Sequence, residues 1–124
     1  MLRKSGTLRN AAGRSASTVL THVGLSLTGL ALWIGFLVSG NVLPAWLALA
    51  AITAGNSLGD SLLIARGRRL TGERRGFWPD YGAAIAAVFR GRMPRTVIFH
   101  ALFAGVVFFS CLGVCIGATI AAAA

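Results

Sequence analysis

The sequence predicts an all-α membrane protein with three transmembrane helices and one short helix at the cytoplasmic membrane surface. The 124-residue chain is 56% hydrophobic and only 12% charged. A soluble domain of this size cannot bury so much apolar surface, because its surface-to-volume ratio is too high. The apolar residues gather in three long runs, and every Lys and Arg lies outside these runs. We therefore expect a single integral membrane domain over residues 1–124.

The three apolar runs cover residues 18–38, 43–65 and 96–121. Each is long enough to cross ~30 Å of hydrocarbon as a helix, and lipid cannot satisfy a more open backbone. Residues 39–42, Ser-Gly-Asn-Val, indicate a tight turn. Pro44 suits the first turn of the following helix, where its missing N–H costs nothing. The first two spans are therefore expected to form an antiparallel hairpin.

The distribution of charge predicts the orientation of the chain. All twelve Lys and Arg lie within residues 3–14 and 66–95, while the short turn and the C-terminal tail carry none. The positive-inside rule then predicts a cytoplasmic N-terminus, a cytoplasmic long loop and a C-terminus on the outer side. The composition, rich in Ala, Gly and Arg, suggests a multi-pass protein of a bacterial cytoplasmic (inner) membrane. Small residues before Asn41 also fit signal-peptide cleavage, although the first run exceeds a usual signal core.

The formal net charge of +9 favours a membrane surface over nucleic acid as the partner of the basic residues. Arginines beside apolar runs are typical of topology signals and of contacts with anionic lipid headgroups. The aromatic residues lie mostly inside apolar segments, where they cannot stack on bases. The expected headgroup contacts are Arg66, Arg68, Arg69, Arg74, Arg75, Trp78, Arg90 and Arg92.

The loop at residues 66–95 contains an aromatic cluster followed by a helix-like pattern. Phe77, Trp78 and Tyr81 form the cluster, and Pro79 is suited to open a helix. That helix would carry the apolar residues Ile85, Val88 and Phe89. Aromatic residues beside arginines are typical of a helix that lies among lipid headgroups. The alternative is an ordinary loop with a few buried anchors.

Each span carries one ionisable residue at a similar depth. At 1.5 Å per helical residue, His22, Asp60 and His100 lie in the cytoplasmic half, with Asn56 one turn deeper than Asp60. A carboxylate there costs up to ~3 kcal/mol and needs a partner, for which the two histidines are the available candidates. We therefore hypothesise that His22, Asn56, Asp60 and His100 converge as an intramembrane polar cluster.

Four interpretations of these polar residues remain open. They could bond between helices as structural contacts. They could stay apart, with Asp60 reaching towards the arginines. His22 and His100 could ligate haem b or a metal, since imidazole suits iron, copper and zinc. Asp60 and a histidine could relay protons. No cofactor is the first expectation, and haem b is the alternative to it.

Small residues in the spans predict close helix packing, because they allow backbones to approach. The first span carries them at a spacing that forms one narrow face, and the other spans carry pairs of glycines. These helix-packing residues are Gly24, Gly35, Gly55, Gly59, Gly113 and Gly117. Three helices with so many small faces suggest a homo-oligomer or other integral membrane subunits as partners.

The chain lacks the sequence patterns of common enzyme sites. It has no serine elbow, no paired carboxylates, no Gly-rich phosphate loop and no zinc motif. The run from Asn56 to Asp60 resembles the Asn-Ser-x-x-Glu core on the second span of bacterial diacylglycerol kinases. The acids that flank this core in that family are absent here, so magnesium and nucleotide would have little to hold them. We assign no family from this likeness.

These observations favour a small non-catalytic membrane subunit that stabilises or anchors a larger respiratory, energy-transducing or secretion complex. The first alternative is a cofactor-binding or proton-handling subunit that uses His22, Asp60 and His100. The second alternative is a small lipid-modifying membrane enzyme, which the missing acids disfavour.

Overall fold

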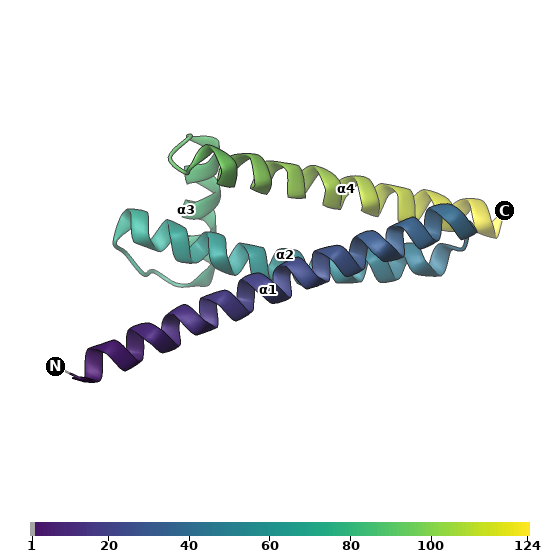
Figure 1. Cartoon of the computed structure of the whole chain (residues 1–124). Coiled ribbons are helices and arrows are strands. Elements are labelled where there is room, and N and C mark those ends of the chain that lie inside the picture. The colour runs from purple at the N-terminus through teal and green to yellow at the C-terminus, as the bar shows by residue number, and fades with distance from the viewer. Residues whose placement is uncertain (1) are drawn as a thin grey trace.

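The chain folds entirely into helices. The computed structural model describes the backbone of Leu2–Ala124 and the side chains from residue 15 onward, so the basic block at residues 3–14 lies outside the described side chains. The described backbone forms α1 (Leu2–Ser39), α2 (Val42–Thr71), α3 (Phe77–Phe89) and α4 (Arg95–Ala123) (Figure 1).

Three of these helices are long and apolar enough to cross a membrane. They are Ser15–Ser39 of α1, all of α2 and all of α4, with mean hydropathies of 1.6, 1.4 and 2.3. This finding confirms the predicted all-helical class and the three predicted apolar helices. It indicates a multi-pass membrane protein, because lipid is the solvent that tolerates helices of this kind.

The turn between α1 and α2 follows the local chemistry of its residues. Gly40 adopts a left-handed φ of 68°, which a residue without Cβ accepts at no steric cost. Asn41 then caps α2, because its side-chain oxygen accepts a hydrogen bond of 3.0 Å from the Leu43 N–H. The chain therefore reverses within two residues, and α2 returns along α1.

Helix α2 continues to Thr71, beyond the apolar run that ends at residue 65. Arginine is a good helix former. Arg68 and Arg69 lie in the last turn, where their positive charges interact favourably with the negative end of the helix dipole. Gly72 ends the helix in a left-handed conformation, with its N–H donating to the Arg68 carbonyl over 2.9 Å. Hydropathy marks the apolar part of this helix, whereas the cap sets its end.

The helices meet in two hydrophobic clusters at opposite ends of the molecule. The first core comprises Ala45, Leu49, Cys111 and Cys115, which join α2 to α4. The second core comprises Leu63, Ala84, Val88 and Met93, which join α2 to α3 and to the start of α4. In Figure 1 the α1–α2 turn and the C-terminus share one end, and α3 crosses between α2 and α4 at the other. The fold is therefore a wedge, closed at the first core and held open by α3.

Candidate functional site

A cavity of about 1140 Å³, here called the central cavity, is lined by residues from all four helices. Apolar side chains from α3 and α4 form most of its walls, with Ile85, Val88 and Phe108 among them. Its polar lining is concentrated in a few side chains from every helix. These include His22, Asn56, Asp60, Arg66, Tyr81 and His100.

His22 of α1 is fixed by a hydrogen bond to α2. Its Nδ1 lies 2.7 Å from the Gly55 carbonyl oxygen. A carbonyl only accepts, so Nδ1 carries the proton and donates, and the Nε2 atom of the neutral ring is left as the acceptor. A Cβ at Gly59 would lie 3.1 Å from the His22 Cε1 atom, which is tighter than ordinary contact, so the His22 ring would have to shift to admit a side chain there. Of the two predicted packing residues on α2, Gly59 therefore makes space for the His22 ring, whereas Gly55 accepts its hydrogen bond and lies against Leu25 and Ser26.

His100 of α4 faces the ring of His22. The two ring centroids are 5.8 Å apart, and the ring planes are inclined by 78°. Among the described residues, no α-carbon of α1 comes within 8 Å of one in α4. The two imidazoles therefore meet across a space that the backbones leave open.

A second cavity of about 270 Å³ shares His22, Asn56 and His100 with the central cavity. Its other walls are largely apolar and lie towards the first core, with Trp33 and Phe103 among them. Within the described part of the chain, Asn56 is half-buried and its side-chain amide makes no hydrogen bond. The pair of histidines and this amide thus stand between two cavities.

Asp60 is paired with Tyr81 of α3 and not with a histidine. Asp60 and Tyr81 both line the central cavity, and their side chains lie close enough to interact. Burial first, and then the neighbouring Asp60 charge, raise the pKa of Tyr81 above its usual value of 10.0. The sequence pointed to His22 or His100 as the partner, because Tyr81 lies in the loop and its position depends on how α3 folds back.

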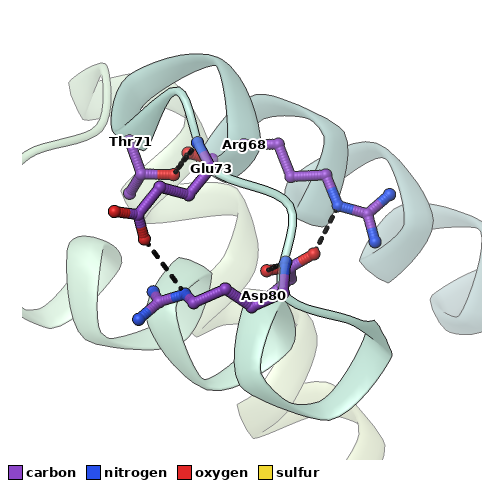
Figure 2. A network of polar contacts seen from close by, with 6 residues as sticks. Arg68, Thr71, Glu73 and Asp80 are labelled. Carbon is purple, nitrogen blue, oxygen red and sulfur yellow. Dashed lines mark hydrogen bonds and ion pairs between the residues drawn. The ribbon is translucent and has the colours of Figure 1, made fainter.

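Asp80 is the buried ionised group that the sequence interpretation missed. Its side chain accepts a 2.6 Å bond from Arg68 Nε and a 3.1 Å bond from the Arg75 backbone N–H (Figure 2). Burial alone would raise the pKa of Asp80, but these two bonds and the Arg68 charge together lower it below its usual value of 3.8. The carboxylate therefore ties the start of α3 to the last turns of α2. An acid directly after Pro79, in a first helical turn, was the available signal.

Of the residues predicted to contact lipid headgroups, one is half-buried against another helix and the others have exposed side chains. Arg68 is half-buried and bound to Asp80, so this residue serves a contact within the chain. Arg75 forms an exposed ion pair of 3.2 Å with Glu73 (Figure 2). The remaining predicted residues have exposed side chains: Arg66, Arg69, Arg74, Trp78, Arg90 and Arg92.

The predicted packing glycines also divide into two groups. Gly55 and Gly59 lie against α1, whereas Gly24, Gly35, Gly113 and Gly117 have no other part of the chain within 4 Å of a built Cβ. Among the described glycines of α1, Gly29 lies tightest against α2, because a Cβ there would lie 2.8 Å from Ile52 Cγ1. The narrow face that small-residue spacing selects on α1 is therefore turned away from α2.

The described residues do not form a cluster of three or more His, Cys, Asp or Glu side chains suited to a metal ion. The donor set at the cavity is two imidazoles, one of them with its tautomer fixed. No family model, no curated protein and no solved structure matches this chain. A proposal for its function therefore rests on the open wedge, its polar lining and its uncovered helix faces.

Proposed function

We propose that this chain is a small non-catalytic subunit of a larger complex in a bacterial inner membrane. The observation that carries the proposal is the set of small-residue faces that the chain does not use for its own packing. Gly24 and Gly35 on α1, and Gly113 and Gly117 on α4, have no neighbour within 4 Å of a Cβ. Small residues at such positions let the helix of another subunit approach closely.

The large apolar side chains beside these faces support the same proposal. Leu27 and Ile120 are 62% and 65% exposed, and they lie on the two helices that carry the uncovered glycines. Lipid tails or the helices of another subunit are the surroundings that suit such side chains. The outer faces of α1 and α4 would thus be available to neighbouring subunits.

We further propose that the N-terminus and the long loop lie in the cytoplasm. The arginines of residues 66–95 gather at the α3 end of the wedge, while the opposite end has no basic residue among its described side chains. Trp78 and Phe89 of α3 are 75% and 74% exposed, which suits a helix lying among headgroups. Labelling each terminus with a membrane-impermeant reagent tests this orientation. Termini on the same face would contradict it.

Purification from native membranes tests the subunit proposal. In a mild detergent, the full chain should be recovered with other integral membrane proteins in a fixed ratio. Gly24→Leu and Gly113→Leu should each reduce this recovery, because a larger side chain prevents close helix approach. Gly82→Leu is the matched control, since Gly82 is exposed on α3 with no neighbour within 4 Å. Recovery of the chain as a solitary monomer would contradict the proposal.

A second candidate function is supported by the contact between the His22 and His100 rings. A cofactor-binding subunit would use these side chains as ligands, with Asp60 available for proton handling near them.

A further inference from the structure

We infer that His22 and His100 are the two axial ligands of one haem, which binds between α1 and α4 across both cavities. The site is complete within a single chain, so it does not depend on the proposed host complex. Three independent features of the described residues carry the inference.

The first feature is the tautomer of His22. Its Nδ1 proton is held by the Gly55 carbonyl at 2.7 Å. Histidines that ligate metals commonly donate their other ring N–H to a carbonyl or carboxylate, which fixes the ring and makes the free nitrogen more basic. Nε2 of His22 is therefore the atom prepared for an iron, and it has no partner within the described chain.

The second feature is the separation of the two rings. Two imidazoles bound on opposite sides of one iron have ring centres about 6 Å apart, given metal–nitrogen bonds of ~2 Å. The rings of His22 and His100 are already 5.8 Å apart. Among the described residues, the α-carbons of α1 and α4 stay more than 8 Å apart, so the ligands reach inward from separated helices.

The third feature is the space on both sides of the histidine pair. A macrocycle centred between two axial ligands extends away from their axis in several directions. The histidine pair lines both the central cavity, of about 1140 Å³, and the second cavity, of about 270 Å³. Trp33 and Phe103 provide an apolar wall at one side, while Arg66 lines the central cavity and is suited to a propionate.

A bare metal ion is a poorer match to these donors. Catalytic and structural zinc sites take three or four protein ligands, and the described residues offer no such cluster. A haem supplies four nitrogen ligands itself, so two imidazoles complete its coordination. Such an iron has no open position, which suits one-electron transfer and not the binding of a gas or substrate.

Titration of the purified full chain in detergent with haemin tests the inference. The chain contains only two histidines, so a low-spin bis-imidazole spectrum reports on this pair. We expect saturation at one haem per chain and a low-spin spectrum in both oxidation states. His22→Ala and His100→Ala should each convert the bound haem to a high-spin form or prevent stoichiometric binding.

Three further variants keep the test decisive if the alanine variants fold poorly. His100→Met retains an axial ligand and should give a six-coordinate haem with a raised reduction potential. Gly59→Leu should displace the His22 ring and weaken haem binding by about tenfold or more, as loss of supporting contacts does at other metal sites. Gly82→Leu, which meets no neighbour, should leave haem binding unchanged.

Two results would overturn the inference. One is a wild-type chain whose added haem remains high-spin or exceeds one equivalent without saturation. The other is recovery of the low-spin spectrum on mixing the two alanine variants, which would place the haem between two copies of the chain.

Discussion

Tyr81 connects the short helix α3 to the polar wall of the central cavity through its interaction with Asp60. Burial and the Asp60 charge both raise the pKa of this phenol. Asp60→Asn removes the charge and leaves the burial, so the pKa of Tyr81 should fall towards 10.0 without reaching it. Absorbance of the phenolate during an alkaline titration measures this, because the chain has one tyrosine.

The control for this titration is Tyr81→Phe, which should abolish the phenolate signal. If Asp60→Asn left the midpoint of Tyr81 unchanged, the two side chains would not interact in the folded protein. Asp60 would then have a different partner, and the arrangement of α3 against α2 would need revision.

Asp80 should make the docking of α3 sensitive to acid. Its folded-state pKa lies below its unfolded value, so the carboxylate stabilises the fold above about pH 4, and this contribution is lost as the pH falls through the folded value. We expect the melting temperature of the wild type in detergent to drop over that acidic range. Asp80→Asn should be less stable at neutral pH and should show a smaller drop.

Glu73→Gln is the matched control for Asp80→Asn. Glu73 and Arg75 form an ion pair whose side chains are 61% and 53% exposed. Exposed pairs contribute ~0–1 kcal/mol, so this variant should melt close to the wild type at every pH. Equal pH profiles for Asp80→Asn and the wild type would show that Asp80 does not control the acid response.

The sequence predicts a common depth for the residues of the site, but it does not predict which way each helix is rotated. Counting residues from the arginines gives His22, Asp60 and His100 a similar depth. Hydropathy does not state which way each helix faces, so the choice of Tyr81 as the partner of Asp60 needed the position of α3. The Arg68–Asp80 pair joins two helices across a loop, and neither residue type alone marks it.

At the scale of helices, Gly67 allows α2 and α3 to pack closely. A Cβ at this position would lie 3.0 Å from the Cβ of Ala84, which is fully buried. Gly67→Leu should therefore push α3 away from α2 and destabilise this contact by about 1–3 kcal/mol. Proteolysis after the arginines of residues 66–75 should become faster, because the loop is anchored by α3.

Gly82→Leu provides the comparison on the opposite side of this contact. Gly82 lies on α3, and a Cβ there meets nothing within 4 Å. This variant should keep the wild-type rate of proteolysis. Equal rates for both leucine variants would mean that the α2–α3 contact does not protect the loop.

The helices themselves were predicted more fully than their contacts. Long apolar runs identify the three spanning helices, and Pro79 indicates a helix in the loop, which begins at Phe77. The contact face of α1 was harder to predict. The spacing of small residues selects Gly24 and Gly35 as the contact face of α1. In the structure it is Gly29 that lies against α2, because the Ile52 side chain occupies the space where a Cβ would be.

At the scale of the whole molecule, the first core should control stability. Leu49 is 7% exposed and packs in this core with the two cysteines. Leu49→Ala should destabilise the chain by about 2 kcal/mol or more, because it removes buried methyl groups and leaves a cavity. Unfolding in mixed detergent–SDS micelles measures this change. Leu47→Ala is the control, since Leu47 is 49% exposed and should cost less.

The same variant should expose Cys115, whose side chain is fully buried. A membrane-permeant thiol reagent should label Cys115 faster in Leu49→Ala than in the wild type. Unchanged labelling together with unchanged unfolding would show that the first core does not hold α2 and α4 together.

A further tie at this closed end is the 2.9 Å hydrogen bond that the Trp46 indole donates to the Thr119 hydroxyl. One end of α4 is held against α2 by these contacts. At the other end α3 lies between α2 and α4, so the length of α3 sets the distance between those two helices. Each residue added to α3 lengthens this helix by ~1.5 Å. Inserting or deleting a single turn within α3 would therefore change the distance between α2 and α4 without replacing His22 or His100. Evolution can thus change the width of the cavity independently of the side chains that bind a ligand.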